Sequence, residues 1–375
     1  MSSEYRICTR CVMDTTDPDI VFDENGVCNH CHTYDRMVRE YVVDGDAGLH
    51  KLEQIAEKIR KDGQGKKYDC VIGVSGGVDS TYVAFRVKQL GLRPLAVHLD
   101  NGWDSELAVK NIEETLKRLD IDLYTEVLDW EEFRDLQVSF LKASTPDSEI
   151  PTDHAIVALL SNMAEKLGVK YIIVGHNVRT ETHLPRSWSQ GHFDWKYIRA
   201  IQEKFGTLPL KTFPHFGFIK FYLRMITQKR IEILNYIGYN KKEALRILQD
   251  DLGWRYYGGK HYESIYTRFY QGYILPEKFG FDKRRSHLSS LVCSGEITRI
   301  QALDDLKAPT YAPSMQEEDR EYVVKKLGLT EDEFTVIMAS PRKTYWDYPS
   351  YGQFMKSPLV VKMVPFVKRV VSLFK

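Results

Sequence analysis

The chain has 375 residues, and its 52 Lys and Arg residues balance 52 Asp and Glu residues. Hydrophobic residues make up 43% and charged residues 28%, close to the averages of globular proteins. At one domain per ~150 residues, this length predicts two or three domains. The composition excludes a largely disordered chain and a protein that holds nucleic acid by bulk positive charge.

Four of the six cysteines lie near the N-terminus, as two Cys-x2-Cys pairs: Cys8 with Cys11, and Cys28 with Cys31. Two such pairs separated by about 15–20 residues are typical of a tetrahedral zinc site. Four thiolates leave no open coordination position, so we expect a structural metal that folds a head too short for its own core. An iron–sulfur cluster is the alternative. His30 and His32 lie nearby, but the complete set of four cysteines does not need them.

The first residues, Met1 to Arg6, show no basic start with an apolar run, so no signal peptide is predicted. No uncharged apolar stretch reaches the ~18 residues of a spanning helix. We therefore expect a cytoplasmic protein, in which clustered cysteines bind metal more often than they form disulfides.

Beyond the head, an amphipathic helix is predicted over residues 50–60, with Leu52, Ile55 and Ile59 at helical steps. Short apolar strands then alternate with helical patterns. The predicted strands are 69–74, 94–99, 121–127 and 171–174, and the predicted helices are 79–90, 106–119 and 153–167. Continuous apolar strands that alternate with helices predict an α/β fold, a doubly wound parallel sheet covered on both faces.

The alternation ends near residue 205. Residues 206–235 are aromatic and basic without a clear period, and three pairs with capping-box spacing follow: Asn240 with Glu243, Ser314 with Glu317, and Thr330 with Glu333. We expect a metal-binding head (1–45), an α/β domain (46–205) and a mostly helical region (206–375). The tail 357–375 is basic and apolar; we favour packing within the chain or a dimer over contact with an anionic membrane.

The first predicted strand leads into Gly73-Val-Ser-Gly-Gly-Val-Asp-Ser80, which opens a helix. Adjacent glycines allow a tight turn, and the N–H groups of a helix N-terminus suit an anion. The segment has no Lys and lacks GxGxxG spacing, so it is neither a Walker A loop nor a dinucleotide fingerprint. It also fits Gly-x-Ser-x-Gly, the nucleophile elbow of serine hydrolases, although no HGGG-like oxyanion segment accompanies it.

The sequence Ser75-Gly-Gly-Val-Asp-Ser80 resembles the SGGxDS loop of the PP-loop ATP pyrophosphatases, which transfer AMP from ATP to a substrate oxygen. The resemblance implies Mg²⁺ near Asp79 and a phosphate-binding set of Ser75, Gly76, Gly77, Val78, Asp79 and Ser80. It also implies that Leu99, Asp100 and Asn101 lie beside adenine. Gly175, His176 and Asn177, with Glu181, are similar to the GHN…E segment of the same superfamily. The α/β domain would then bind ATP.

Three further segments resemble the N-acetyl sugar amidotransferases of bacterial surface-polysaccharide synthesis, the WbpG-like family: residues 11–18, 258–264 and 275–289. This resemblance covers residues 6–305, and residues 306–375 add little to it. It implies that ATP and ammonia convert an acetamido group of a nucleotide-linked diacetamido uronic acid into an acetamidino group. The amide oxygen would be adenylylated, and ammonia would then displace AMP.

Guanidinium groups bind diphosphates and carboxylates through two hydrogen bonds, and both anions would be present on such a substrate. The residues expected to bind the sugar nucleotide are Tyr257, Lys260, His261, Glu263, Lys283, Arg284, Arg285 and His287. The expected catalytic residues are Ser75, Asp79, Lys260 and His261. For the basic run Lys283–Arg285, a solvated surface is the alternative. His98 and His154 are expected to be core or surface residues.

The sequence contains no recognisable glutaminase. Ser2 follows Met1, Cys70 lies in an apolar strand, and Cys293 is not in a Gly-x-Cys-x-Gly elbow. We therefore expect ammonia from a separate partner resembling the glutaminase and cyclase subunits of histidine biosynthesis, and a homodimer stays open. No nucleic acid is expected to bind. The alternatives are a tRNA-modifying PP-loop enzyme using a basic patch at residues 211–231, a serine hydrolase, and a non-catalytic nucleotide-binding subunit.

Overall fold

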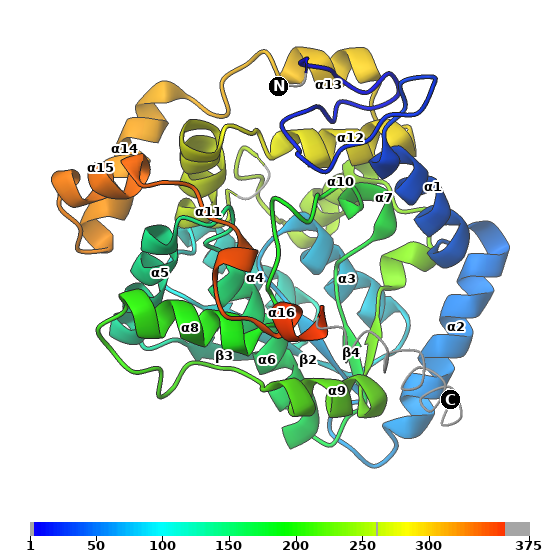
Figure 1. Ribbon diagram of the computed structural model, residues 1–375. Coiled ribbons are helices and arrows are strands. Elements are labelled where there is room, and N and C mark those ends of the chain that lie inside the picture. Colours follow the sequence, from blue (N-terminus) through cyan, green and yellow to red (C-terminus); the bar gives the residue numbers. More distant parts are fainter. Residues whose placement is uncertain (1–3, 260–261, 357–375) are drawn as a thin grey trace.

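The computed structural model describes residues 4–259 and 262–356 (Figure 1). At its centre lies a five-stranded sheet in the order β3-β2-β1-β4-β5, in which every neighbouring pair is parallel. The strands are β1 (Cys70–Gly73), β2 (Pro94–Asp100), β3 (Asp122–Val127), β4 (Tyr171–Ile173) and β5 (Lys229–Ile231). The order reverses between β1 and β4, and ligands of open α/β sheets bind at such a point, beyond the carboxyl ends of the strands.

The two faces of the sheet contribute to two separate hydrophobic cores. Val71 of β1 packs in one core, and its neighbours Cys70 and Ile72 pack in the other, as the two-residue period of a strand requires. The face of Cys70 and Ile72 is covered by α2 (Gly45–Asp62), α3 (Val78–Gln89), α4 (Glu106–Arg118) and α10 (Lys241–Leu252). The opposite face is covered by α5 (Trp130–Ala143), α6 (Ile150–Lys166) and α8 (Trp195–Phe205). This is the doubly wound α/β fold that the alternation predicted.

Nine further α-helices lie outside these two layers in the described part of the chain. They are α1 (Asn29–Tyr41), α7 (Val178–Glu181), α9 (Phe218–Thr227), α11 (Ile265–Phe269), α12 (Arg284–Ser294), α13 (Arg299–Asp305), α14 (Pro313–Lys326), α15 (Glu331–Ala339) and α16 (Tyr351–Met355). Two short 3₁₀ helices, Ile233–Tyr236 and Tyr345–Asp347, and a π-helix, Tyr270–Phe279, lie between them. After β5, the described residues contain helices and no further strand of the sheet.

The N-terminal segment lies against helices that are distant in the sequence. In Figure 1 the dark blue head lies beside α12 and α13. The Arg299 guanidinium donates to the carbonyl oxygens of Cys8 and Cys11 at 2.8–3.2 Å, and the Val12 N–H donates to Ser289 Oγ at 3.2 Å. The head is therefore held by the C-terminal part of the chain.

The four predicted strands and the helices between them are present, with ends that differ by a few residues. The sequence-based predictions missed the helices α1, α5, α7 and α8 and the edge strand β5, in which Lys229 and Arg230 are exposed. Because β5 pairs with β4, the sheet continues past residue 205, where we expected the α/β part to end. The division into three domains stays a prediction.

The predicted helix starts were correct in two of three cases. Asn240 caps α10, and Thr330 forms a complete capping box with Glu333 at the start of α15. The prediction for Ser314 was wrong, because α14 already begins at Pro313, and Ala312 precedes it. The tail 357–375 lies outside the described residues. Among the residues that are described, no helix combines the length and the apolar character needed to cross a membrane.

Candidate active site

The loop between β1 and α3 leaves a helix N-terminus open. Gly76 has φ +76°, and a Cβ there would lie 2.8 Å from the Ala108 carbonyl oxygen, so this turn requires glycine. The hydroxyls of Ser75 and Ser80 lie 3.2 Å apart, and the Ser75 N–H donates to Ser80 Oγ at 3.2 Å. No side chain caps α3, so the first N–H groups of this helix remain able to bind an anion.

The loop that follows β4 lies directly against this turn. A Cβ on Gly175 would come within 3.0 Å of the backbone of Asp79 and Ser80. Next to it, His176 Nδ1 lies 3.2 Å from Glu232, and Nε2 lies 3.9 Å from Glu181. Burial disfavours the charged imidazole, but the two carboxylates outweigh it and raise the pKa of His176. The imidazole and two carboxylates therefore form a charged edge beside the loop.

The opposite side of the loop contacts residues from a distant part of the chain. The Tyr239 hydroxyl donates to Asp79 Oδ1, and Trp254 Nε1 donates to the Gly76 carbonyl oxygen at 3.0 Å. Burial, followed by the charge of Asp79, raises the pKa of Tyr239, so the phenol stays protonated as a donor. Burial, followed by the charges of Glu263 and Asp79, raises the pKa of Tyr257 in the same way.

These walls enclose a cavity of about 420 Å³ at the switch point of the sheet, a size typical of small-molecule sites. It is lined by Ser75, Gly77, Val78, Asp79, Ser80, Gly175, His176, Glu181, Lys241, Tyr256, Tyr257, Gly259, Glu263 and His287. The structure thus brings eight of the expected nucleotide-binding residues together with Tyr257, Glu263 and His287 from the expected substrate set.

Five of the expected nucleotide-binding residues do not line this cavity: Gly76, Leu99, Asp100, Asn101 and Asn177. Leu99 is buried, Asp100 accepts from the Gly102 N–H at 2.8 Å, and Asn101 donates to Thr152 Oγ1 at 3.2 Å. Asn177 caps α7, and the carbonyl oxygen of Gly76 accepts a hydrogen bond from Trp254. Lys260 and His261 lie outside the described residues. For all of these residues, the expected role stays a prediction.

The basic run at the start of α12 has internal partners. Lys283 Nζ lies 3.7 Å from Glu149, Arg284 pairs with Asp282 at 2.7 Å, and Arg285 pairs with Asp14 at 2.9 Å. The Arg284 guanidinium also donates to the carbonyl oxygens of Asp305, Ala308 and Pro309. None of the three cations lines the cavity. These contacts differ from a freely solvated basic surface, and the expected role of the three residues in substrate binding stays a prediction.

The sequence-based predictions assigned no role in the site to Tyr239, Lys241 or Tyr256. Tyr239 contacts Asp79, and Lys241 and Tyr256 line the cavity. The only local signal was the aromatic run Trp254-Arg-Tyr-Tyr257, next to the expected substrate segment. His98 and His154 are core residues as expected: the first pairs with Asp104 at 3.2 Å, and the second stacks on Phe216.

A second depression, of about 490 Å³, lies near the amino end of β1 and is lined in part by Arg60 and Arg93. Arg60 donates to the Leu90 carbonyl oxygen, and Arg93 donates to those of Lys66 and Gly63. Because α/β sheets bind ligands at the opposite, carboxyl edge, we place the candidate site in the cavity beside Asp79.

The four head cysteines come together as one fully buried cluster. Their sulfur atoms are 3.6 Å (Cys11–Cys28), 3.7 Å (Cys28–Cys31) and 3.9 Å (Cys8–Cys31) apart. With Zn–S bonds of about 2.3 Å, tetrahedral geometry requires sulfur separations of about 3.8 Å. Backbone N–H groups of Arg10, Cys11, Met13 and Cys28 point at the sulfurs. The cluster is therefore compatible with zinc.

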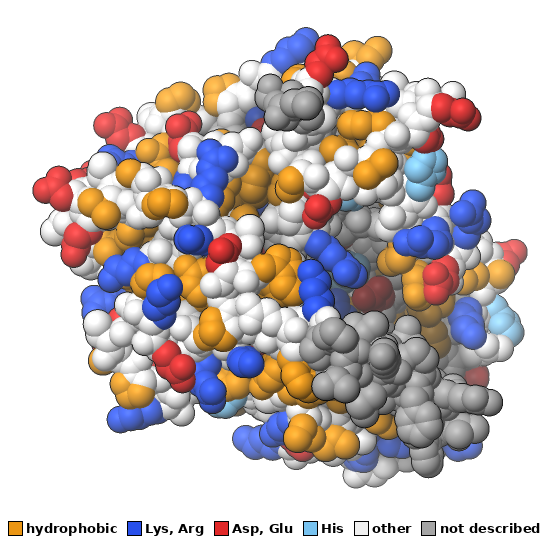
Figure 2. Space-filling model, viewed as in Figure 1, with side chains coloured by type: hydrophobic (Ala, Val, Ile, Leu, Met, Phe, Trp, Pro, Cys, Tyr) orange, Lys and Arg blue, Asp and Glu red, His pale blue; other side chains and the backbone are white. Residues whose placement is uncertain are grey.

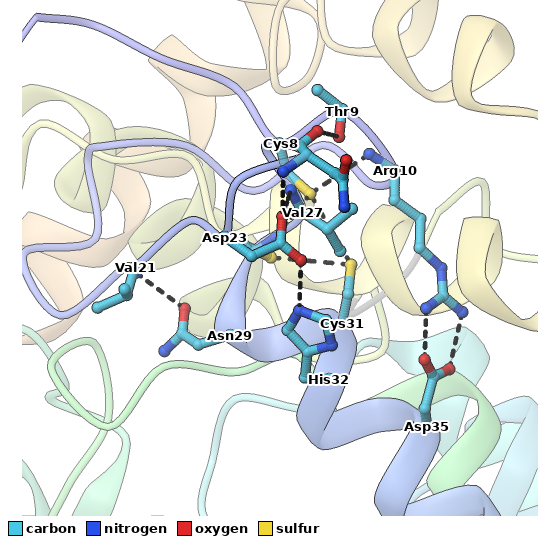
Figure 3. A network of polar contacts seen from close by, with 12 residues as sticks. Cys8, Thr9, Arg10, Val21, Asp23, Val27, Asn29, Cys31, His32 and Asp35 are labelled. Carbon is cyan, nitrogen blue, oxygen red and sulfur yellow. Dashed lines mark hydrogen bonds and ion pairs between the residues drawn. The ribbon is translucent and has the colours of Figure 1, made fainter.

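The histidines of the head have other partners. Figure 3 shows the ring of His32 on the carboxylate of Asp23. His30 Nε2 lies 2.7 Å from Asp17. Neither histidine belongs to a candidate metal group among the described residues.

Residues 263–361 match the family model described as "LPS biosynthesis protein WbpG-like, C-terminal domain". This part of the chain is therefore similar to the WbpG-like C-terminal domain. This confirms the resemblance for that part of the chain and extends it beyond residue 305, where we had expected little further similarity. Residues Glu263 and His287 of the cavity belong to this domain.

The search of curated proteins found no match. Among solved structures, a predicted tRNA methyltransferase subunit from Methanocaldococcus jannaschii is 17% identical, with a TM-score of 0.28; the match covers 48% of this chain and 74% of that one. NMN synthetase from Francisella tularensis is 14% identical, with a TM-score of 0.34, covering 75% and 96%. NH3-dependent NAD synthetase from Campylobacter jejuni is 13% identical, with a TM-score of 0.31, covering 79% and 98%.

Proposed function

We propose that this protein is an ATP-dependent amidotransferase of lipopolysaccharide and O-antigen biosynthesis. It converts an acetamido group of a nucleotide-linked N-acetyl sugar, a UDP-diacetamido uronic acid, into an acetamidino group. The observation that carries the proposal is that one cavity joins the loop at Asp79 to Glu263 and His287 of the WbpG-like domain. In this proposal, a nucleotide and a second substrate share one site.

The phosphates of ATP would lie on the N-terminus of α3, because this helix has no side-chain cap and its loop is shaped by glycines. The hydroxyls of Ser75 and Ser80 line the same wall and can donate to phosphate oxygens. The carboxylates of Asp79 and Glu181 also line the cavity and would hold Mg²⁺. When bound, Mg²⁺ would neutralise charge on the phosphates.

An amide carbonyl is a poor electrophile, and its oxygen is a poor leaving group. Attack of the amide oxygen on the α-phosphate forms an oxygen–phosphorus bond and releases pyrophosphate, leaving an O-adenylyl imidate. Ammonia adds to the imidate carbon, loses a proton, and AMP departs with the oxygen, so an amidine remains. The residues of the cavity would act mainly by positioning the two substrates and by balancing charge on the phosphates.

The remaining parts of the proposal concern the metal, the ammonia and the location. Zn²⁺ at Cys8, Cys11, Cys28 and Cys31 would be structural, because four thiolates complete its coordination. Ammonia would come from a separate glutaminase partner, and the reaction would take place in the cytoplasm. Lys260 and His261 are proposed as catalytic groups on the basis of the family resemblance.

The test is incubation of the pure chain with ATP, Mg²⁺, ammonium and a panel of UDP-diacetamido uronic acids, followed by mass spectrometry. We expect one oxygen of one sugar to be replaced by NH, with equal amounts of AMP and pyrophosphate. Omission of the sugar should remove both. Replacement of ammonium by glutamine should abolish turnover, and turnover with glutamine alone would contradict the separate ammonia source.

The tRNA-modifying alternative depends on a basic surface at residues 211–231. In the structure, Arg224 is buried in an ion pair with Glu165, Lys220 lies 3.6 Å from the same carboxylate, and Arg230 lies 3.5 Å from Glu232. On the face shown in Figure 2, basic and acidic side chains are both spread over the surface. Binding of tRNA with a steep dependence on salt would favour this alternative.

A further inference from the structure

The cysteine cluster of the head continues into the C-terminal part of the chain. Cys293, on α12, places its sulfur 3.8 Å from the sulfur of Cys31. His183, two residues beyond the end of α7, places Nε2 3.6 Å from Cys293 Sγ. Cys31, His183 and Cys293 thus bring three ligand atoms within 4.8 Å of one another, beside the four-cysteine set.

The separations match the coordination of one ion. Two thiolates on a tetrahedral zinc ion stand about 3.8 Å apart, and a thiolate and an imidazole nitrogen stand about 3.5 Å apart, given bonds of about 2.3 and 2.0 Å. The observed values are 3.8 Å for Cys31–Cys293 and 3.6 Å for Cys293–His183. The three atoms therefore have the spacing of ligands around a single ion.

The orientation of the imidazole supports this interpretation. His183 is fully buried, and its Nδ1 lies 3.0 Å from Ser290 Oγ, while Ser290 Oγ donates to the Ser286 carbonyl oxygen at 3.2 Å. A histidine that binds metal through one nitrogen is usually held by a hydrogen bond at the other. The contact at Nδ1 fixes the ring so that Nε2 points at the sulfur atoms.

We propose that Cys31, Cys293 and His183 bind a second zinc-class divalent ion, and that the Cys31 thiolate bridges it to the ion of the four-cysteine set. On binding, the Cys293 thiol loses its proton and coordinates as a thiolate, whereas His183 coordinates as the neutral imidazole. The fourth position of the second ion is left for a water molecule or another bridging thiolate.

Charge favours the second ion. Four thiolates around one divalent ion carry a net double negative charge, and here all four sulfurs are buried. Five thiolates around two divalent ions carry a net single negative charge. A buried net charge is costly, so the paired arrangement reduces the electrostatic cost of the cluster.

The second ion would join three parts of the chain: the head through Cys31, α12 through Cys293, and the segment after α7 through His183. Glu181 and His287, which line the cavity, lie on α7 and α12. The metal would therefore fix the relative positions of two cavity walls. This inference does not depend on which sugar the protein modifies.

The test is the zinc content of the full chain, purified with zinc in excess and measured by native mass spectrometry. The wild type should hold two ions, and Cys293→Ser and His183→Gln should each hold one. Cys70→Ala is the matched control: it removes a buried cysteine of β1 that belongs to neither candidate metal group, and it should keep two ions.

Substitution with ¹¹³Cd gives a second measurement that needs no variant. Two cadmium resonances of different ligand type, coupled through the shared Cys31 sulfur, are expected. A single ion in the wild type would overturn the proposal, as would two ions retained in both Cys293→Ser and His183→Gln. Because the wild-type count and the cadmium spectrum stand alone, the proposal stays testable if a variant fails to fold.

Discussion

The loop at residues 75–80 and the basic run at residues 283–285 both precede or open a helix, but they use polar groups in opposite ways. The loop leaves the N-terminus of α3 without a side-chain cap and turns Asp79 and two serines toward a cavity. At the start of α12, by contrast, each of the three cations has an acidic partner inside the chain. Two polar runs of the same chain thus differ in whether their side chains line a cavity or pair with groups inside the chain.

The difference between the two runs lies in the acidic side chains that the fold places beside the three cations. Arg285 pairs with Asp14, a fully buried carboxylate of the head, and also donates to the Val12 carbonyl oxygen. Burial disfavours the charged form of Lys283, but Glu149, Asp147 and Asp153 outweigh it and raise its pKa. These contacts hold the head and the loop before α6 against α12, which is a structural role.

The largest expected effect comes from removing the Asp79 carboxylate from the loop at residues 75–80. Asp79→Ala should lower kcat for pyrophosphate release by about 1000-fold, because it removes a carboxylate proposed to hold Mg²⁺. Its unfolding midpoint should stay close to that of the wild type. Tyr239→Phe is the matched control, since it keeps the carboxylate and removes only its hydrogen-bond donor. If Asp79→Ala forms AMP at the wild-type rate, the loop is not the phosphate site.

The next largest effect is expected from breaking the ion pair between Arg285 and Asp14. Arg285→Ala should destabilise the protein by about 3 kcal/mol in denaturant unfolding, because it leaves the buried carboxylate of Asp14 without its cation. KM for the sugar nucleotide should stay unchanged in the fraction that folds. Lys307→Ala, which breaks an exposed pair with Asp304, should change stability by less than about 1 kcal/mol. A raised KM with wild-type stability would instead make Arg285 a substrate ligand.

A smaller effect is expected from the one residue near the basic run that reaches the cavity. His287→Ala should raise KM for the sugar nucleotide about tenfold, equivalent to about 1.4 kcal/mol, and leave KM for ATP unchanged. Ser294→Ala, at the end of the same helix, is the control and should leave both constants unchanged. Equal changes in both KM values would contradict a separate sugar-binding wall.

The difference between the two regions also explains which parts sequence analysis predicted. The strands of the sheet are short apolar runs, and the loop at Ser75–Ser80 follows β1 directly, so local sequence is enough to predict them. Tyr239 and Lys241 reach the site because α10 packs on the same face as α3, a contact that no local pattern encodes. For the same reason, the ion pair between Asp14 and Arg285 was not predicted.

The edge strand β5 and the residues Cys293 and His183 were missed for separate reasons. The edge strand β5 is three residues long and begins with the exposed Lys229 and Arg230, so it lacks the apolar run of a buried strand. Cys293 and His183 lie far from the four head cysteines in sequence, and neither stands in a Cys-x2-Cys pair. The packing of α12 and of the segment after α7 beside the head brings them to Cys31.

The smallest effect concerns a group that avoids charge altogether. His154 is fully buried, stacks on Phe216 with ring centroids 4.4 Å apart, and lies 2.8 Å from the His192 carbonyl oxygen through Nδ1. Burial lowers the pKa of His154 to about 4. In the unfolded chain the same group has a pKa of about 6.5. Between these two values the unfolded state binds more protons, so stability must fall as the pH falls.

Between pH 6.5 and 5.5 this linkage should remove about 1 kcal/mol from the free energy of unfolding. In His154→Gln that contribution should be absent, so the slope of stability against pH should be shallower than in the wild type over the same interval. The measurement is denaturant unfolding of both proteins at several pH values, with slopes compared rather than absolute stabilities, because the substitution also removes ring stacking. Identical slopes would mean that His154 becomes charged within the folded protein, and that this buried face of α6 tolerates charge as the start of α12 does.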